Sequence, residues 1–382
     1  MMTVYLDFYS CLNLGDDLFI KILLERYPNI QFVTSNVYID NYKLISKEYN
    51  NLKIINESYL FRVFRTIITR YYDGIKSNVK VPVWLNNTIL NFYFNKKLMS
   101  SAYVYLHIGG SIFIQQNDTL QLKHFKKSWI KDNFSSMPQF ILGANFGPYH
   151  TEEYKLHFSE IFKSYTDICF REKYSYELFK DLPCVRYTSD IVFQLDIPQI
   201  EPDVNSFGFS IIDISRRKDL TDFSDIYFTE ISSMISQLIE KDKKVSLFSF
   251  CKQEGDEDAI AKILELLPKS NHNKLEIVKY DGDTNFFLNK YAHIGNMFTT
   301  RFHAMILSLK ARQNVYPLIY SNKLTNVLKD IKFEGEYSYI KDMCKGCGDH
   351  MLSTIKTNNH SLGCEAQNSA KQFLILDSLL LP

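Results

Sequence analysis

Strand-like and helix-like segments alternate along most of this chain, and that alternation restricts its fold more than any other feature. The first three segments are residues 3–8, 16–26 and 30–34, in the order strand, helix, strand. This order predicts a βαβ unit, in which two parallel strands share a sheet and the helix covers it. The start of the chain therefore predicts an α/β domain with a mostly parallel sheet.

The alternation occurs in two series. Between them, residues 194–205 contain Pro198 and Pro202 and show no helical period, which indicates a linker. We therefore predict two Rossmann-like α/β domains facing a cleft, at residues 1–198 and 199–365. A C-terminal helical segment, residues 366–382, either crosses back onto the first domain or caps the second. Further strands are predicted at 52–55, 103–108, 139–142, 167–170, 185–187, 207–212, 245–250, 275–278, 295–298 and 315–319, and further helices at 225–240, 256–267, 303–309 and 370–380.

Composition limits the class of protein and its partners. With 46% hydrophobic and 23% charged residues, the chain can bury a core, and a net charge of +1 argues against a nucleic-acid partner. The first apolar residues follow no basic region and carry Asp7, so a signal peptide is not expected. Seven scattered cysteines form no disulfide framework and are typical of a reducing compartment. We expect a cytoplasmic protein without a membrane span.

One segment, residues 62–97, differs from its surroundings. Seven lysines and arginines lie there among aromatic and apolar residues, and only Asp73 opposes them. The pattern suits peripheral contact with the inner face of a membrane, or else a pair of surface helices whose basic side is solvated.

The segment from Thr299 to Ile306 places Arg301 and His303 where a predicted strand gives way to a helix. At such a junction an anion can meet a fixed cation, a titratable imidazole and the positive end of the helix dipole. The alternative is a buried arginine with a capping role and a core histidine.

The loop after the first strand reads Asn-Leu-Gly-Asp-Asp at residues 13–17. Asp16 or Asp17 could bind sugar hydroxyls, or Asn13 or Asp16 could simply cap the helix. Neither the G-x-G-x-x-G nor the P-loop pattern is present, so no nucleotide cofactor is expected.

Polar and glycine-rich groups follow other predicted strands. Paired glycines allow close backbone approach to a ligand, although each loop could equally be a tight turn. Because ligands of open α/β sheets bind beyond the carboxyl ends of the strands, these loops are candidate binding loops. Arg171 could bind a carboxylate or phosphate or form a salt bridge, and Glu254 could bind an acceptor sugar or lie solvated at the surface. The candidates in these loops are Gly109, Gly110, Ser111, Asn145, Arg171 and Glu254.

Cys344, Cys347 and His350, with Cys364 further on, could in principle bind zinc. Only one C-x-x-C pair is present, whereas structural zinc sites commonly use two ligand pairs. We expect free cysteines and no metal.

Several of these motifs in order, NLGDD, HIGGSIF, GANFGPY, CFREKYSYEL, SDIVF, TTRFHAMILSL and PLIYSNK, resemble the polysaccharide pyruvyl transferase family. The resemblance covers residues 13–323 and implies a fold similar to that of GT-B-type glycosyltransferases. It departs from the usual pattern at Phe302, where leucine is more common, and in the GANFGP loop.

The resemblance implies transfer of pyruvate from phosphoenolpyruvate to two hydroxyls of one sugar, as a cyclic ketal, in a precursor of a capsule or other surface polysaccharide. His303 would be the general acid, and Arg301, Arg171 and Lys323 would bind the anionic donor. Replacing His303 or Arg301 by alanine should then abolish activity and preserve the fold. The acceptor, which could be lipid-linked, would bind at Asn13, Asp16, Asp17, Gly109, Gly110, Ser111, Asn145 and Glu254.

Two other functions suit the same sequence. One is a nucleotide-sugar glycosyltransferase of the same architecture, in which Arg301 and Lys323 would bind a diphosphate. The other is a carbohydrate-binding protein without catalytic activity.

Overall fold

The computed structural model describes residues 2–9, 11–35, 42–55, 63, 67, 96–115, 122–358 and 360–381. The chain divides into two compact units. The first unit holds residues 1–10, 19–191 and 370–382, and the second holds residues 11–18 and 192–369. The sequence pattern suggested changes of domain after residues 198 and 365, whereas packing places them after residues 191 and 369 and groups residues 11–18 with the second unit.

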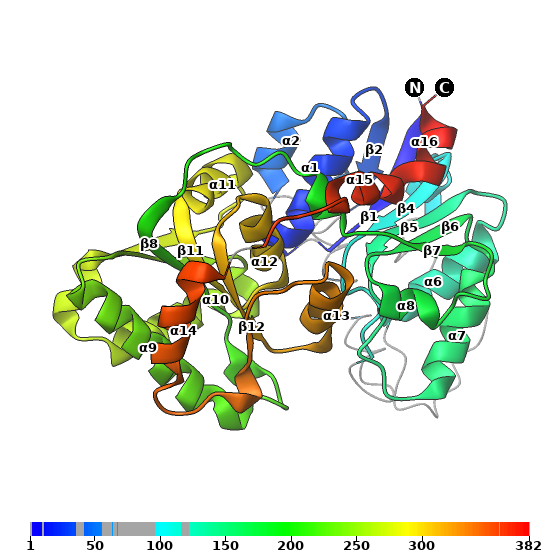
Figure 1. Cartoon of the computed structure of the whole chain (residues 1–382). Coiled ribbons are helices and arrows are strands. Elements are labelled where there is room, and N and C mark those ends of the chain that lie inside the picture. Colours follow the sequence, from blue (N-terminus) through cyan, green and yellow to red (C-terminus); the bar gives the residue numbers. More distant parts are fainter. Residues whose placement is uncertain are drawn as a thin grey trace. The chain divides into compact units, whose positions relative to one another are not determined.

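The first unit is built on a seven-stranded parallel sheet with the order β3-β2-β1-β4-β5-β6-β7 (Figure 1). All six residues of β5 are buried, as expected for a parallel sheet covered on both faces. The strands are β1 Thr3–Asp7, β2 Gln31–Thr34, β3 Leu52–Ile54, β4 Val104–Ile108, β5 Gln139–Ala144, β6 Asp167–Phe170 and β7 Val185–Tyr187, and the helices are α1 Leu14–Arg26, α2 Lys43–Glu48, α5 Lys96–Met99, α6 Leu122–Asn133, α7 Glu152–Phe162, α8 Lys173–Glu177 and α16 Leu374–Leu380.

The second unit repeats this plan with a six-stranded parallel sheet of order β10-β9-β8-β11-β12-β13. Its central strand β11 is also buried at all six residues. The strands are β8 Asp203–Ser210, β9 Lys244–Ser249, β10 Leu275–Lys279, β11 Ile294–Thr299, β12 Asn314–Ile319 and β13 Ser338–Tyr339, and the helices are α9 Ser224–Glu240, α10 Asp256–Leu266, α11 Thr284–Ala292, α12 Phe302–Lys310, α13 Asn322–Asp330, α14 Cys347–Thr354 and α15 Glu365–Ala370.

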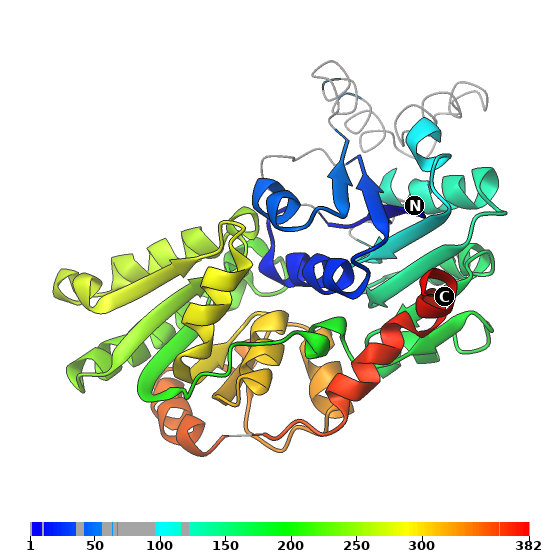
Figure 2. The ribbon, with the colours of Figure 1, turned by 90° about the horizontal axis from the view of Figure 1, so that it is seen from above.

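In each sheet the direction of chain travel reverses once, at β4 in the first unit and at β11 in the second. Because crossovers between parallel strands are right-handed, this reversal puts the helices before and after it on opposite faces. Figure 2 shows α1 on one side of the first sheet and α6 and α7 on the other. Open α/β sheets bind ligands beyond the carboxyl ends of the strands at this reversal. The loops after β1, β4, β8 and β11 are therefore the candidate ligand-binding loops.

The predicted strands and helices agree closely with the observed ones, and most boundaries differ by one or two residues. The largest differences are at β8, which begins at Asp203, inside the predicted linker, and at the helix predicted for residues 370–380, where a short 3-10 helix, Lys371–Phe373, separates α15 from α16. Asp203, the first residue of β8, pairs with Ile294 of β11 next to an irregularity in the register. A hydrophobic pattern gives no sign of such an irregularity. The short edge strand β13 was not predicted, because its two residues carry too little pattern.

The C-terminal segment packs within the first unit. The carboxylate of Asp377 accepts hydrogen bonds from Arg26 and from the Tyr27 hydroxyl, the latter at 2.7 Å. The side chain of Gln372 accepts a hydrogen bond from the Gly143 N–H at 3.1 Å and donates to the carbonyl of Ser189 at 3.1 Å. Polar contacts of this kind fix the segment in the fold, in addition to its apolar face.

None of the helices in the described ranges has both the length and the apolar character needed to cross a bilayer. Of the basic aromatic segment, residues 62–97, the structure describes only residues 63, 67, 96 and 97. The predicted membrane contact falls almost wholly outside the described residues and stays a prediction.

Candidate active site

Arg301 lies directly after β11, the strand at which the second sheet reverses, and helix α12 begins at the next residue. Only 9% of its side chain is exposed. Its guanidinium pairs with two carboxylates: Nη1 with Glu254, and Nε and Nη2 with Asp256. Both acids belong to the loop and helix start that follow β9, so the parallel sheet brings the two strand ends together.

The two carboxylates differ in their surroundings. The side chain of Asp256 is fully buried and also accepts hydrogen bonds from the N–H groups of Phe250 and Cys251, at 2.9 and 3.0 Å. Burial raises the pKa of Asp256, although Arg301 opposes that shift. Burial would also raise the pKa of Glu254, but the charge and hydrogen bond of Arg301, together with the charges of Lys323 and Arg217, outweigh burial and lower that pKa to about 2. The positive charge of Arg301 is thus already balanced within the protein.

His303 lies in the first turn of α12, and its ring packs on the backbone of Gly15. A Cβ atom placed on Gly15 would lie 1.8 Å from Nδ1 of His303, so no other residue fits there without moving the imidazole. The ring also contacts Phe302 edge to face, with 5.0 Å between centroids. The glycine of the 13–17 loop is therefore explained by close approach to His303.

The same loop joins the Arg301 cluster through Asn13. Its Nδ2 donates to Oε1 of Glu254 at 2.9 Å, and its Oδ1 accepts the Gly15 N–H at 3.0 Å. The second bond is a helix cap, as the capping interpretation expected. Asp17 is apart from this group, because its side chain is buried and accepts a hydrogen bond from the Tyr280 hydroxyl at 2.8 Å. Asp16, between them, is partly exposed.

Lys323 is the second residue of α13, the helix that follows β12. Its ammonium nitrogen lies 5.8 Å from the centre of the Phe302 ring and 5.4 Å from that of Tyr320. The second unit thus gathers five of the predicted residues, namely Asn13, Glu254, Arg301, His303 and Lys323, around the start of α12.

The first unit contains a second arginine cluster, centred on Arg171 after β6. The guanidinium donates to Asp190 at 3.1 Å and to the amide oxygen of Asn145 at 2.7 Å. Both members of the ion pair are buried, with side-chain exposures of 2% and 0%. Arg171 thus forms a salt bridge with a nearby acid, as the alternative interpretation expected, and that acid is Asp190. The carboxylate of the next residue, Glu172, accepts a hydrogen bond from Ser175 at 2.7 Å.

The predicted glycine loop after β4 contacts the same cluster. A Cβ atom on Gly110 would lie 2.6 Å from Nη1 of Arg171, and the Ser111 hydroxyl donates to Asn145 at 3.1 Å. Gly109 adopts φ of 154°, a value that favours glycine. Four predicted residues, Gly110, Ser111, Asn145 and Arg171, therefore share one site in the first unit.

A buried polar network at the reversal of the first sheet was not predicted. The Tyr105 hydroxyl donates to Asp7 at 2.6 Å, and Nδ1 of His107 lies 3.1 Å from the same carboxylate oxygen. Lys127 of α6 joins them through contacts with Tyr105 and His107. Asp7 at the end of β1 was the available signal, because a carboxylate in an apolar strand needs buried partners.

Two further acids were missed, Asp256 and Asp190, which are the partners of Arg301 and Arg171. Asp190 lies in the SDIVF motif, and Asp256 lies two residues after Glu254. The signal for both is general, since a buried arginine requires a counter-charge. Sequence spacing alone did not identify which acids supply it.

The side chains of Cys347 and His350 have different partners. Cys347 contacts Glu230 through its sulfur at 3.8 Å, whereas His350 faces Glu336 at 2.8 Å. In the described ranges no group of three or more histidines, cysteines or acids could hold a metal ion.

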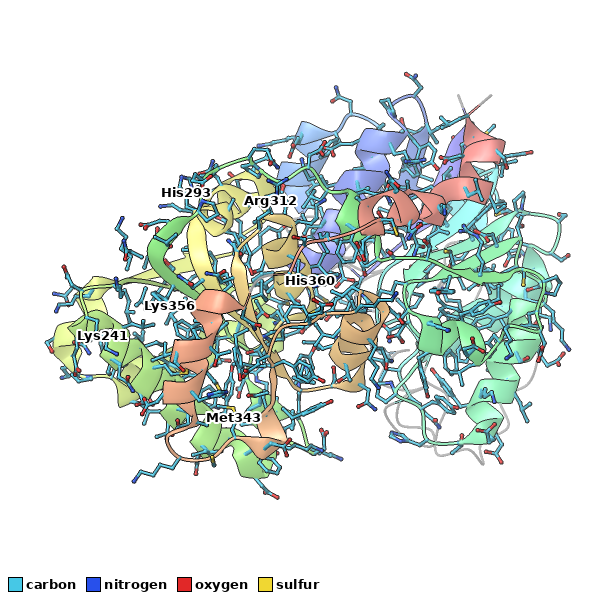
Figure 3. The ribbon with its side chains drawn as sticks, in the orientation of Figure 1. Lys241, His293, Arg312, Met343, Lys356 and His360 are labelled. Carbon is cyan, nitrogen blue, oxygen red and sulfur yellow. The ribbon has the colours of Figure 1, made fainter. Side chains whose placement is uncertain are left out.

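Basic side chains also occur at the opposite edge of the second sheet. Lys241, His293 and Arg312, labelled in Figure 3, come shortly before β9, β11 and β12 and are exposed. They lie at the amino ends of the strands, whereas the candidate site uses the carboxyl ends.

Two parallel-sheet α/β units with these strand orders define the GT-B-like class. The fold is similar over 99% of both chains to UDP-GlcNAc 2-epimerase from Methanocaldococcus jannaschii, with a TM-score of 0.59 and 12% identity. It is also similar to the putative UDP-N-acetylglucosamine 2-epimerase from Listeria monocytogenes, over 99% of this chain and 96% of that chain, with a TM-score of 0.59 and 9% identity. At such identities the likeness shows the fold alone, and it confirms the predicted class.

Residues 13–322 match the sequence profile of the polysaccharide pyruvyl transferases. The chain belongs to the polysaccharide pyruvyl transferase family, as its ordered motifs predicted. Among curated proteins, none matches the chain.

Proposed function

We propose that this protein transfers the pyruvate unit of phosphoenolpyruvate to two hydroxyls of one sugar, in a precursor of a surface polysaccharide. Family membership supports a transferase of this kind. The observation that carries the proposal is the packing of His303, at the start of α12, against the backbone of Gly15 and beside the Arg301 cluster. A titratable imidazole is held there next to fixed charges, as proton transfer to an anionic substrate requires.

The reaction needs a proton on carbon and two alcohol attacks. His303 would protonate the methylene carbon of the enol phosphate, so that positive charge develops at the adjacent carbon, and a sugar hydroxyl would add there and lose its proton. Loss of phosphate, attack by the second hydroxyl and loss of its proton complete the ketal. The two hydroxyl protons balance the new methyl hydrogen and the proton on the released hydrogen phosphate. An imidazole with an ordinary pKa of about 6.5 can both give and accept protons near neutrality.

Arg301 would act first by positioning. Its guanidinium holds Glu254 and Asp256, and so fixes the loop after β9 against the start of α12. Direct donor binding by Arg301 would require the donor to displace Glu254, the more exposed of its two partners. Arg171, bound to Asp190 and Asn145, would bind an anion only through the remaining capacity of its N–H groups.

The acceptor sugar would bind through neutral and acidic groups. Each unit separately offers such groups. In the second unit, Asn13, Asp16 and Glu254 present an amide and two carboxylates that can hydrogen-bond sugar hydroxyls. In the first unit, Ser111 and Asn145 present a hydroxyl and an amide. Gly109 and Gly110 would allow close backbone approach. Asp17 is buried beneath Tyr280, so we assign it a structural role instead of the acceptor contact first expected.

The test is an assay of purified protein with phosphoenolpyruvate and a panel of sugar acceptors, including lipid-linked ones. The expected result is equal release of phosphate and formation of an acid-labile ketal, lost in His303→Ala with an unchanged thermal transition. Failure on every acceptor, together with hydrolysis of a nucleotide sugar, would replace this proposal with a glycosyltransferase of the same architecture.

A further inference from the structure

Two cations of the second unit converge on one buried aromatic ring. The guanidinium carbon of Arg217, from the loop after β8, lies 4.4 Å from the centre of the Tyr320 ring. The ammonium of Lys323, from α13, lies 5.4 Å from the same centre. Tyr320 itself is only 8% exposed. Arg217 lies in the loop after β8, and β8 is paired with β11 at the point where the second sheet reverses. This cluster therefore lies at that reversal.

Neither cation is neutralised by an ion pair of its own. Among the residues that the structure describes, neither Arg217 nor Lys323 forms a salt bridge with an acid. The neighbouring Arg216 pairs with Asp213 and Asp258, and Arg301 pairs with two carboxylates. Beside Tyr320, the positive charge available to a ligand therefore comes from Arg217 and Lys323.

The pKa values of two neighbouring groups, Tyr320 and Glu254, indicate a positive electrostatic potential around these cations. Burial alone would raise the pKa of the Tyr320 phenol, yet the charges of Lys323, Arg217 and Arg301 bring that pKa below its ordinary value. Lys323 and Arg217 also add to the effect of Arg301 in lowering the pKa of Glu254. A phenol that ionises more easily in spite of burial means that negative charge is stabilised at this point.

A hydrogen-bond donor lies two residues before Lys323 in the chain. Ser321 precedes α13, and its hydroxyl oxygen is buried without a hydrogen-bond partner among the described residues. A buried hydroxyl without a partner costs free energy, so a ligand oxygen is the natural partner for it. Helix α13, nine residues long, adds the positive end of its dipole.

We propose that Arg217, Lys323 and Ser321, arranged around Tyr320, bind the phosphoryl group of a phosphate ester. This inference rests on the proposed function, under which the group is the phosphate of phosphoenolpyruvate, later released as inorganic phosphate. A phosphoryl group matches two cations and a hydroxyl, since it carries up to two negative charges and three acceptor oxygens. The same chemistry would suit the diphosphate of a nucleotide-linked or lipid-linked acceptor, so the test must separate the two sources.

Phe302 connects this site to the proposed general acid. Its ring, 3% exposed, lies under the ammonium of Lys323 and meets His303 edge to face. A phosphoryl group held by Lys323 would therefore be bound beside the residue that precedes His303 in the chain. A leucine at this position would offer no aromatic face to the ammonium.

The test is calorimetric titration of the full chain with inorganic phosphate, phosphoenolpyruvate and UDP. Arg217→Gln and Lys323→Gln should each weaken binding of phosphate and phosphoenolpyruvate by about tenfold or more, as expected for charge-assisted hydrogen bonds. Lys218→Gln and Lys329→Gln are the matched controls. They remove the same charge from exposed positions next to Arg217 and later in α13, and should change affinity by less than about twofold.

Each outcome has a distinct meaning. If Arg217→Gln keeps its fold by circular dichroism and binds phosphate as tightly as the wild type, the inference is wrong. If the variants lose UDP binding but retain phosphoenolpyruvate binding, the assignment to the donor phosphate is overturned. If phosphate binding depends on Arg217 while the wild type forms no ketal with any acceptor, the site stands and the proposed function fails.

Discussion

The two buried arginine clusters, around Arg301 in the second unit and Arg171 in the first, look alike in sequence and differ in charge. Each arginine follows a buried strand and is almost fully buried. Arg301 pairs with two carboxylates, whereas Arg171 pairs with one carboxylate and one neutral amide. The Arg301 cluster therefore carries a net charge of about −1 and the Arg171 pair a net charge of about zero.

This difference shows that a conspicuous arginine need not supply the positive charge of a site. An anionic substrate near Arg301 would meet one cation and two acids unless other cations lie close by. Arg217 and Lys323 provide them, with Tyr320 between. The two arginine clusters thus have separable roles. The Arg301 cluster positions the loop after β9 through a buried ion network, and the Arg171 cluster holds Asn145 and the glycine turn after β4.

The largest effect is expected from Arg301→Ala. It leaves Asp256 fully buried and Glu254 without their counter-charge, and should cost about 3–5 kcal/mol of the free energy of unfolding at neutral pH, as well as activity. Urea unfolding of the wild type and the variant measures the difference. The expectation from the sequence, that this variant preserves the fold, is thereby revised.

Arg216→Ala is the control for that prediction. Arg216 also pairs with two aspartates, but 49% of its side chain is exposed, so its loss should cost less than about 1 kcal/mol. Equal losses in the two variants would show that burial of the ion network has no special weight.

The pH dependence of stability should separate Glu254 from Asp256. The pKa of Glu254 falls from 4.5 to about 2 in the folded protein, so its stabilising contribution is complete above about pH 5 and is lost as pH falls toward 2. The free energy of unfolding of the wild type should exceed that of Glu254→Gln by about 1–3 kcal/mol at pH 6, and this difference should disappear near pH 2. The pKa of Asp256 is raised, so its effect on stability has the opposite dependence on pH. Burial of this carboxyl group costs less free energy in acid, where the group is protonated.

Unfolding of both proteins in urea at pH 6, 4 and 2.5 gives this difference directly. Glu265→Gln is the control, because Glu265 is exposed in α10, and its difference from the wild type should not change with pH. A difference that stays constant between pH 6 and 2.5 for Glu254→Gln would contradict the low pKa.

The strand and helix pattern predicted the fold well because it is local. Short apolar runs identified β1 and β6, and a helix-like run identified α1, each within two residues of its bounds. The parallel order of strands then placed the loops after β4, β6, β9 and β11 at the carboxyl edges of their sheets, which is why Gly110 with Arg171, and Glu254 with Arg301, were found as candidates.

What could not be predicted depends on contacts between distant residues. Asn13 meets Glu254 across 241 positions, and Tyr280 meets Asp17 across 263. No periodicity encodes such pairs, and a capping residue such as Asn13 has the same sequence signature whether or not its second polar group binds an acid. The exposure of a charged residue cannot be read from local sequence either, and a solvated surface carboxylate was therefore the favoured interpretation of Glu254.

Two glycines test the close packing of the two clusters. Gly15→Ala would press on the His303 ring, and Gly110→Ala on the guanidinium of Arg171, at 1.8 and 2.6 Å from the added carbon. Each should cost about 1–3 kcal/mol of stability, and Gly15→Ala should also reduce kcat by displacing the imidazole. Gly363→Ala is the control, because its nearest contact, with Glu365, would be an ordinary 3.6 Å. An active Gly15→Ala variant would remove His303 from the proposed chemistry.

The smallest predicted effect belongs to Phe302→Leu, which removes the aromatic ring near Lys323. The ring of Phe302 lies 5.8 Å from the Lys323 ammonium, and a cation–π contact of this kind contributes about 0.5–1 kcal/mol. Donor affinity should therefore fall by about two- to fivefold with little change in thermal stability, because the two side chains are similar in volume. In the Lys323→Gln background the same substitution should have no effect on affinity. A loss that persists in that background would mean that Phe302 acts through His303 and not through the cation.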